Sequence, residues 1–402
     1  MDSQDNNGAQ TQTHHHDQSN LEDGRHTTTN VDNSPFIITS PDDIQELHNK
    51  YAPYARHDMY GTMGRGKLPW TQKIRLAIAV IVLFPLRVVV GTLVVVLYYL
   101  ICKACTLFKV PNREEDNDQE DYAHMGGFRR KIICWFGRLL SRALLFVFGF
   151  YWIKESIRNP DIDNKFDNEM DANGESKVTE RPGVIISNHV SHLDILYHMS
   201  SSFPSFVAKK SVSELPLIGL ISKCLGCIFV QREPKSSDFK GVSGVVNDRI
   251  NESLQDKSAP MVMLFPEGTT TNGDYILPFK TGAFLSKAPV LPVILRYPYQ
   301  KFSPAWDTIT GTRHVILLLC QFVNYITVTR LPLYHPSQEE KENPKLYAEN
   351  VRRLMAREGN VKMSDIGLAE KRVYHTAVHG EPTVFHAKVN LFSRFFIGSF
   401  PI

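Results

Sequence analysis

Several patterns that would direct a sequence towards other classes of protein are scarce or missing in this chain of 402 residues. The formal net charge is only +3. It gives no support to nucleic-acid binding, which usually shows as a clustered basic surface. Six cysteines in so long a chain do not make a disulfide framework, so we expect the soluble part to lie in a reducing compartment. The chain does not open on a signal-peptide pattern, and a cleaved secretory peptide is therefore not expected.

The cysteines also give little support to a metal site. Cys102 and Cys105 form one C-x-x-C pair and Cys224 and Cys227 another, which is the spacing of a four-thiolate zinc site. The first pair closes a long apolar segment and would have to leave a membrane to meet the second, so we expect no bound metal. Lipidation of Cys102 or Cys105 beside the membrane is an alternative use of these thiols.

Composition divides the chain into seven regions. Residues 1–34 are almost entirely polar and cannot repay the entropy of ordering; their three consecutive histidines, 14–16, indicate low-complexity sequence rather than a metal site. The predicted regions are a disordered tail (1–40), an N-terminal region with a membrane segment (41–110), an acidic linker (111–127), an interfacial helix region (128–157), a polar linker (158–182), a catalytic domain (183–335), and a C-terminal helical region and tail (336–402).

A long apolar run predicts attachment to a membrane. From Leu76 to Cys102 there are 27 residues whose only charge is Arg87, enough for a helix to cross a hydrocarbon core of about 30 Å. An intramembrane charge is costly and a proline frees a backbone carbonyl. A re-entrant hairpin that bends near Pro85 therefore competes with one tilted span over 76–102. Basic residues flank both ends of the run and leave its orientation open.

The stretch 128–153 is apolar and basic at once. Five cations lie among apolar residues between positions 129 and 142, and residues 143–153 are continuously apolar and aromatic. It fits a buried core helix, or an interfacial helix whose cations face lipid phosphates. Beside a membrane segment we favour the interfacial helix.

Residues 183–335 have the pattern of an α/β domain. Short β-rich runs begin near positions 184, 206, 227, 261 and 290, and residues 239–254 carry apolar side chains at helical spacing. Strands buried on both faces and joined by helices predict a largely parallel sheet with flanking helices. Ligand sites in such sheets lie at the carboxyl ends of the strands.

The first of these strands runs into the sequence SNHVSHLD. Ser191 and Asp194 have the spacing of a helix capping box, a purely structural role. His189 precedes Asp194 by five residues, so the two can meet only if His189 lies on a loop and Asp194 in the first turn of the next helix. Asp194 would then fix the tautomer of His189 and leave its other ring nitrogen to take a proton. His192 lacks that spacing and is expected to be a surface or packing residue.

Two further strands end in side chains suited to an anion. The run GCIFV ends in Gln231 and Arg232, and MVMLF is followed by PEGTTTNG. Gly268 allows a tight turn that exposes N–H groups, and the threonines after it add hydroxyls. Each stretch alone fits an ordinary loop. Together with the His/Asp pair they indicate a site for a phosphate or another anion.

Four short stretches of the chain resemble, in the same order, the four conserved sequence blocks of the glycerolipid acyltransferases. NHVSHLD matches the N-H-x4-D block, GCIFVQR resembles the second, FPEGT the third and VLPVI the proline-containing fourth, all between residues 188 and 294. Outside the blocks, stretches such as YAPYARHDMYGTMG, LLFVFGFYWI and QEEKENPKLYA are similar to the plant lysophosphatidylethanolamine acyltransferases, within the lysophosphatidylcholine acyltransferase-like group. The likeness covers most of residues 40–375.

This resemblance implies the glycerolipid acyltransferase fold and a membrane-bound enzyme. The enzyme would transfer an acyl group from acyl-CoA to the sn-2 hydroxyl of lysophosphatidylethanolamine and other lysophospholipids, with His189 as general base and Asp194 as its support. Acyl-CoA would be a substrate, so no cofactor is expected, and no protein partner is evident. The chain has no G-x-S-x-G elbow, which argues against a serine hydrolase. The implied location is the endoplasmic reticulum membrane, with the active site facing the cytosol.

Other positions match the family's substrate-binding blocks. Arg232 suits the acceptor's phosphate, because a guanidinium makes bidentate contacts. Glu267 cannot itself attract a phosphate and is expected to position Arg232 or a glycerol hydroxyl, while Pro292 is expected to shape its strand. The remaining implied substrate contacts are Gly226, Phe229, Gly268 and Thr269, and candidate contacts for the phosphates of CoA are Lys209, Lys210 and Lys280.

Two alternatives stay open. A 1-acylglycerol-3-phosphate acyltransferase would satisfy the same motifs, because they do not read the head group. A non-catalytic lipid-binding membrane protein would keep the fold without turnover, although the intact His189, Asp194, Arg232 and Glu267 count against it. The chain contains no EF-hand loop, so calcium regulation is not expected. The donors that would stabilise an acyl oxyanion are not assigned by the sequence.

Overall fold

A computed structural model describes residues 41–114, 119–158, 182–230 and 242–379, which all belong to one compact unit of the chain. The predicted tail over 1–40, most of the predicted linker over 158–182, and Arg232 lie outside the described residues.

The centre of the structure is a seven-stranded sheet. In sheet order its strands are β3 (Ile153–Ile157), β10 (Ile326–Arg330), β9 (Val290–Arg296), β4 (Val184–Ser187), β7 (Val262–Leu264), β5 (Ser205–Lys209) and β6 (Ile228–Val230). Every neighbouring pair is parallel except β9 with β10. The α/β fold with a largely parallel sheet is thus confirmed, and the five β-rich runs are strands.

Strands β3 and β10 were not predicted. Strand β3 lies at one edge of the sheet, four of its five residues are exposed, and it reads IKESI. An edge strand with so little burial needs no apolar run, so its sequence does not distinguish it from a loop.

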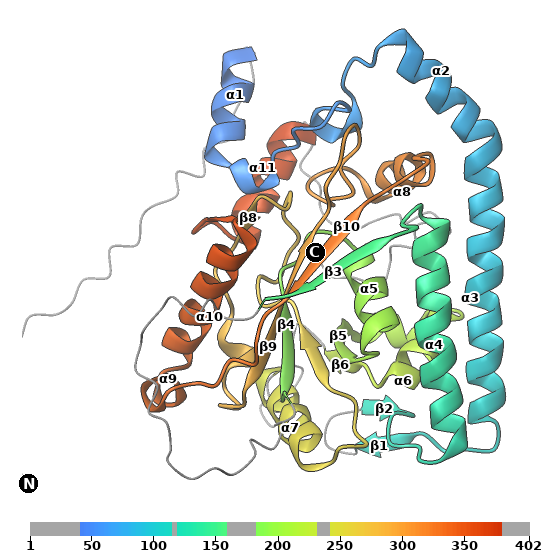
Figure 1. Ribbon diagram of the computed structural model, residues 1–402, viewed down its shortest axis with the longest axis vertical. Coiled ribbons are helices and arrows are strands. Elements are labelled where there is room, and N and C mark those ends of the chain that lie inside the picture. The colour runs from blue at the N-terminus through green and yellow to red at the C-terminus, as the bar shows by residue number, and fades with distance from the viewer. Residues whose placement is uncertain (1–40, 115–118, 159–181, 231–241, 380–402) are drawn as a thin grey trace, which may run out of the picture. The chain divides into compact units, whose positions relative to one another are not determined.

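Helices cover both faces of the sheet (Figure 1). One face packs against α4 (Phe128–Val147), α5 (Leu193–Ser201), α6 (Ile218–Leu225) and α8 (Gly311–Leu319), and the other against α7 (Val242–Gln255) and α10 (Pro344–Gly359). Strand β4 shows the alternation, because Ile185 belongs to the first of these cores while Val184 and Ile186 belong to the second. A strand buried on both faces must be apolar throughout, which explains the sequence VII.

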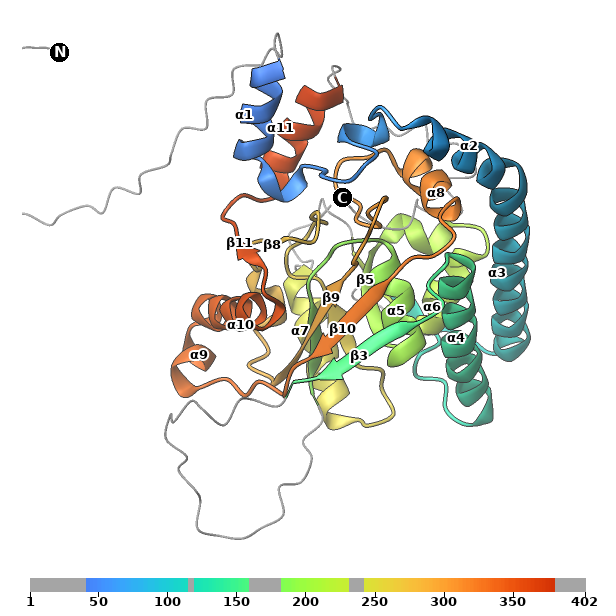
Figure 2. The same ribbon diagram turned by 45° about the horizontal axis from the view of Figure 1, so that its top comes forward.

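Smaller elements surround these layers. They are α1 (Pro41–Lys50), η1 (Ala52–Tyr54), η2 (Thr62–Gly64), β1 (Asn112–Glu114), β2 (Gln119–Asp121), η4 (Lys210–Glu214), β8 (Tyr275–Ile276), η5 (Thr281–Ala283), α9 (Gln338–Glu342), β11 (Lys362–Met363) and α11 (Leu368–His379). Helices α1 and α11 lie side by side (Figure 2), and the rings of Tyr51 and Tyr374 are 5.7 Å apart there. The two ends of the described chain therefore pack together.

The apolar run forms one unbroken helix. It comprises α2 (Trp70–Ile78), a π-helical turn η3 (Ala79–Leu83) and α3 (Phe84–Thr106). The wide turn ends where the Phe84 N–H bonds to the Ala79 carbonyl, immediately before Pro85, which has no N–H to donate. The helix continues through the proline without reversing, so the structure contains no hairpin at Pro85.

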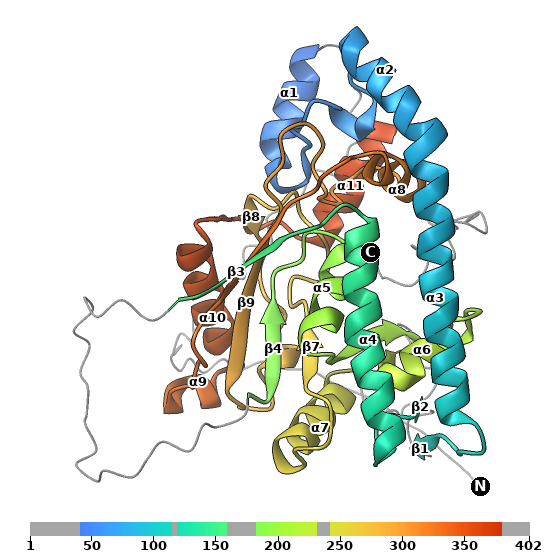
Figure 3. The ribbon, with the colours of Figure 1, turned by 45° about the vertical axis from the view of Figure 1, so that its right-hand side comes forward.

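This helix lies along the catalytic domain. Its length and composition are sufficient to cross a membrane, and it is the one such helix in the described part of the chain. One side packs on α4, α6 and α8 (Figure 3). The other side exposes a stripe of large apolar residues, among them Ile74, Ile78, Ile81, Leu86, Val89, Leu93, Leu97 and Leu100.

Arg87 faces the protein. The residue is 6% exposed, and its guanidinium donates to the backbone carbonyls of Leu319 at the end of α8 and of Gln321 and Phe322 just beyond it, and to the hydroxyl of Tyr151. A cation that satisfies the free carbonyls at a helix C-terminus is favourable. The charge that the sequence places within an apolar run is therefore hydrogen-bonded inside the protein.

We predict that Arg87→Met lowers the free energy of unfolding by about 2 to 4 kcal/mol, because it leaves buried carbonyls without a donor. The measurement is thermal unfolding in detergent micelles, with the exposed Arg75→Met as control. An arginine that faced lipid would give the reverse result, since methionine would then stabilise the protein.

Helix α4 has both an inner and an outer apolar side. Ile133, Leu140 and Leu145 are buried, whereas Phe128, Trp135, Leu139 and Phe146 are exposed. Four of its arginines donate to protein carbonyls: Arg129 to those of Cys105 and Leu107, Arg130 to that of Cys224, Arg138 to that of Ser202, and Arg142 to those of Phe150 and Tyr151. These bonds fasten the helix to its neighbours. Arg129 and Arg138 are exposed as well, so the contact of these cations with lipid phosphates stays a prediction.

One cysteine of the second pair lies beside the first pair, contrary to the expectation that a membrane separates the pairs. The neighbouring Cys102 thiol and burial raise the pKa of Cys224 well above its usual range. In the described ranges no group of three or more metal-ligating side chains is gathered. Cys102 and Cys105 are both buried, so their sulfurs are not accessible to a lipidating enzyme.

Candidate active site

His189 and Asp194 meet at the carboxyl end of β4. His189 lies on the loop after the strand, Asp194 lies in the first turn of α5, and the distance from His189 Nδ1 to Asp194 Oδ2 is 2.9 Å. This is the arrangement that the loop and cap interpretation predicts. The His189 side chain is 10% exposed, whereas that of Asp194 is fully buried.

The Asp194 carboxylate accepts three further hydrogen bonds. Oδ2 also accepts from the backbone N–H groups of Val190 and Ser191, at 2.8 and 3.0 Å, and Oδ1 accepts from the hydroxyl of Tyr297 at 2.6 Å. Burial raises the pKa of Tyr297 well above its usual value, so the phenol keeps its proton. The same Asp194 oxygen thus binds the backbone of the loop and orients His189. No side chain caps α5, whose N-cap is His192, so the predicted capping box is not formed.

Strand β9 and the segments that follow β7 and β9 hold the loop through hydrogen bonds. Asn188 exchanges two hydrogen bonds with the backbone of Leu295 on β9, at 2.8 and 2.9 Å. The His189 carbonyl accepts from the Thr271 N–H at 3.0 Å, and the Val190 carbonyl accepts from the Trp306 N–H at 2.8 Å. The imidazole itself stacks on Phe265, with ring centroids 4.0 Å apart. The catalytic candidate is therefore held through its backbone, its ring face and its Nδ1.

Glu267 holds the backbone of the site. Its two carboxyl oxygens accept from the N–H groups of His189 and Leu277, both at 2.8 Å, and the residue is buried. Burial raises its pKa to about 8. Its predicted contact with Arg232 is not described, because Arg232 lies outside the described residues.

The turn after Glu267 has the predicted glycine conformation. Gly268 has φ +71°, and a side chain there would come within 2.5 Å of the Lys280 ammonium nitrogen. Lys280 therefore lies against this turn. The Thr269 hydroxyl is buried and has no protein partner, while the Thr270 hydroxyl donates to the Trp306 carbonyl. Of the two hydroxyls, that of Thr269 is the one left for a ligand.

The other predicted substrate contacts lie in or beside β5 and β6. Gly226 ends α6 with φ +77°, and a side chain there would meet the Ala123 methyl at 2.5 Å, so packing alone requires a glycine. Phe229 is buried in β6, and Lys209 and Lys210 are partly buried where β5 passes into η4. Pro292 lies within β9 opposite Ile186.

His192 is a packing residue, as the spacing predicts. It is 7% exposed and its ring packs edge-on against those of Phe148, Trp306 and His314. Neither ring nitrogen has a hydrogen-bond partner. Burial lowers its pKa to about 4, so the ring is neutral at physiological pH.

We predict that His192→Phe resists acid better than the wild type. The folded pKa of about 4 lies below the ordinary 6.5, so between these values the unfolded chain binds the extra proton and stability falls as the pH falls. Phenylalanine removes this contribution. Unfolding followed from pH 7 to pH 4 in micelles measures it, and an identical loss of stability in both proteins would contradict the assignment.

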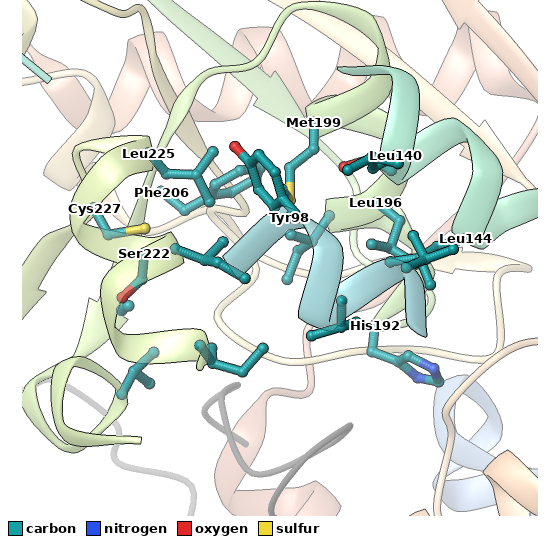
Figure 4. Close-up of a pocket in the computed structure, with 18 of the residues that line it drawn as sticks. Tyr98, Leu140, Leu144, His192, Leu196, Met199, Phe206, Ser222, Leu225 and Cys227 are labelled. Carbon is teal, nitrogen blue, oxygen red and sulfur yellow. The ribbon is translucent and has the colours of Figure 1, made fainter. Parts of the chain in front are cut away.

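An apolar cavity of about 150 Å³ lies beside this loop. Its walls come from α3, α4, α5, β5 and α6, and include Val94, Leu144, Met199, Phe206 and Ile221. Figure 4 shows His192 at one end of the cavity and Leu225 and Cys227 at the other. A cavity with such walls suits a hydrocarbon chain.

Comparison with known proteins now identifies the family. A model of the acyltransferase family matches residues 169–296. The chain is 60% identical over 365 residues to the lysophospholipid acyltransferase LPEAT1 of Arabidopsis thaliana, covering 86% of this chain and 91% of that protein. This chain belongs to the lysophospholipid acyltransferases. It is therefore an acyltransferase, as the four sequence blocks predict.

More distant members of this family are longer. The human lysophosphatidylcholine acyltransferase 1 is 30% identical over 307 residues, which cover 74% of this chain but 51% of the human protein. The chain thus spans about half the length of that relative.

The crystal structure of the 1-acyl-sn-glycerophosphate acyltransferase PlsC from Thermotoga maritima aligns over 69% of this chain and all of its own, with 16% identity and a TM-score of 0.37.

Sequence reasoning missed several residues that surround the His189–Asp194 pair. Tyr297 follows β9 directly, so its position at a strand end is the signal that could have indicated it. Trp306 and Lys371 lie beyond the four blocks, and no spacing rule brings them to the loop that carries His189.

Proposed function

We propose that this acyltransferase moves the acyl group of acyl-CoA directly to the sn-2 hydroxyl of lysophosphatidylethanolamine, with His189 as general base. The observation that carries the proposal is the His189–Asp194 hydrogen bond at the carboxyl end of β4. The name of the plant relative, a lysophospholipid acyltransferase, supports the class of acceptor. The preference for ethanolamine is the expectation that follows from the sequence resemblance.

The geometry supports a single displacement. With Nδ1–H donating to Asp194, the Nε2 lone pair is left to take the proton of the acceptor hydroxyl as its oxygen attacks the thioester carbon. The tetrahedral adduct then expels the CoA thiolate, which takes the proton back from Nε2 and leaves as free CoA. The histidine returns to its neutral form, so this scheme requires neither a covalent acyl-enzyme nor a cofactor.

The apolar cavity gives the acyl chain a place beside the reacting groups. Its wall residues on α3 and α4 belong to the same helices that expose apolar side chains outwards. We propose that this outer surface lies against the membrane. Both substrates carry acyl chains that partition into lipid, and a cavity directly behind membrane-facing helices shortens their path to His189.

The phosphate of the acceptor would be bound at the turn after β7. Gly268, the unpartnered Thr269 hydroxyl and Lys280 support an anion there, and Arg232 would add the bidentate contact. Lys209 and Lys210, at the end of β5, are the candidates for the phosphates of CoA. We place the enzyme in the endoplasmic reticulum membrane with this site towards the cytosol, where acyl-CoA is available.

We predict that His189→Ala abolishes turnover and that Asp194→Asn lowers kcat by about 10²- to 10⁴-fold, because the imidazole loses its orientation and the support for its charge. The measurement uses protein in micelles with radiolabelled oleoyl-CoA. The acceptor panel contains the lyso forms of phosphatidylethanolamine, phosphatidylcholine, phosphatidylserine and phosphatidic acid.

The matched control is His192→Phe, which alters the other histidine of the motif at the wall of the apolar cavity and should lower turnover much less than His189→Ala. An active His189→Ala variant would reject the proposed base. The acceptor panel tests the head group separately, since a clear preference for lysophosphatidic acid would replace ethanolamine by the bare phosphate and leave the base in place.

A further inference from the structure

One buried ammonium group links the C-terminal helix α11 to the two loops that hold His189. Lys371 of α11 is 3% exposed. Its Nζ donates to the Thr270 carbonyl at 2.7 Å, to the Thr270 hydroxyl at 2.8 Å and to the Trp306 carbonyl at 3.5 Å. Thr270 lies on the loop after β7 and Trp306 on the segment after β9, so one nitrogen joins two segments that are distant in sequence.

These bonds continue directly to the catalytic loop. The Thr270 carbonyl and the Thr271 N–H belong to the same peptide group, and that N–H donates to the His189 carbonyl at 3.0 Å. On the other side, the Trp306 N–H donates to the Val190 carbonyl at 2.8 Å. Hydrogen bonds in such a chain polarise and strengthen one another. Lys371 therefore acts on the segments that fix the backbone of His189 and Val190.

Burying a lysine ammonium is energetically unfavourable for a purely structural contact. Its hydrogen bonds go to neutral oxygens, and burial lowers its pKa to about 7 against the attraction of Asp307 and Glu267. A buried cation destabilises the folded state unless its N–H donors are hydrogen-bonded. Helix α11 has other contacts that hold it, including the Tyr374 ring packed against Tyr51 and the bond from the Tyr54 hydroxyl to the Gly367 carbonyl.

We propose that Lys371 is a positioning residue for the acyl transfer: by joining the loops at Thr270 and Trp306 it holds the His189 imidazole in register with the acceptor hydroxyl. The inference rests on the proposed role of His189 as base. It also gives the C-terminal helix, which lies outside the stretch matched by the family model, a part in the reaction.

The test is Lys371→Met in the full-length protein, which keeps the length of the side chain and removes its donors. We expect kcat to fall about 10- to 100-fold, since a small displacement of a catalytic group has effects of this size. The KM values for oleoyl-CoA and the lysophospholipid should not change, because Lys371 contacts neither proposed binding site. Tyr374→Leu is the matched control: it disturbs the packing of the same helix without removing the Lys371 bonds, so it should lower Tm and keep kcat.

A second pair of variants covers the case in which Lys371→Met does not fold. Thr270→Val removes the hydroxyl that Lys371 binds, whereas Thr270→Ser keeps it, so only the valine variant should lose kcat. A folded Lys371→Met with wild-type kcat would overturn the proposal. So would equal losses in Lys371→Met and Tyr374→Leu, or equal kcat values for the two Thr270 variants.

His189→Ala in the same series separates the two proposals. If it is inactive while Lys371→Met has wild-type kcat, the positioning role fails and the general base stands. If it is active, the proposed base fails, whatever the Lys371 variants show.

Discussion

The structure depends on a carboxylate that is buried without a solvent contact and must find all its partners inside the protein. Asp194 finds four: the His189 ring, two backbone N–H groups and the Tyr297 hydroxyl. Burying a charge is costly unless it is hydrogen-bonded, and breaking such a network is costly in turn. The loop after β4 is therefore restricted to the conformation that satisfies this carboxylate, and in that conformation the other nitrogen of His189 is left for chemistry.

The surrounding chain is arranged to hold that loop. Glu267 binds its amide, Thr271 and Trp306 bind its carbonyls, and segments from the two ends of the described chain hold these partners in turn. Arg56 in the N-terminal part binds the segment of Trp306 through Asp307, at 2.9 Å, and Lys371 does so from the C-terminal side. The same principle applies to the apolar helix, where Arg87 binds the carbonyls at the end of α8 and faces away from the exposed stripe.

The sequence predicted the parts of the fold and site that depend on local patterns. Strands such as β4 are apolar throughout because both faces are covered, and His189 and Asp194 are close enough in sequence for turn geometry to bring them together. Strand β3, Tyr297 and Lys371 have no comparable local signal, since edge pairing and long-range contacts place them. The partners of Arg87 and of the α4 arginines are harder still to predict, because a cation beside apolar residues looks the same in sequence whether it meets a lipid phosphate or a backbone carbonyl.

The most direct test of the central claim is the tautomer of His189. Nitrogen NMR of histidine-labelled protein in micelles at neutral pH, assigned by comparison with His189→Gln, reports which ring nitrogen carries the proton. We expect a proton on Nδ1, a bare Nε2, and loss of this signature in Asp194→Asn. A proton on Nε2 with Nδ1 bare, or a signature that survives the removal of the Asp194 carboxylate, would show that Asp194 does not orient His189.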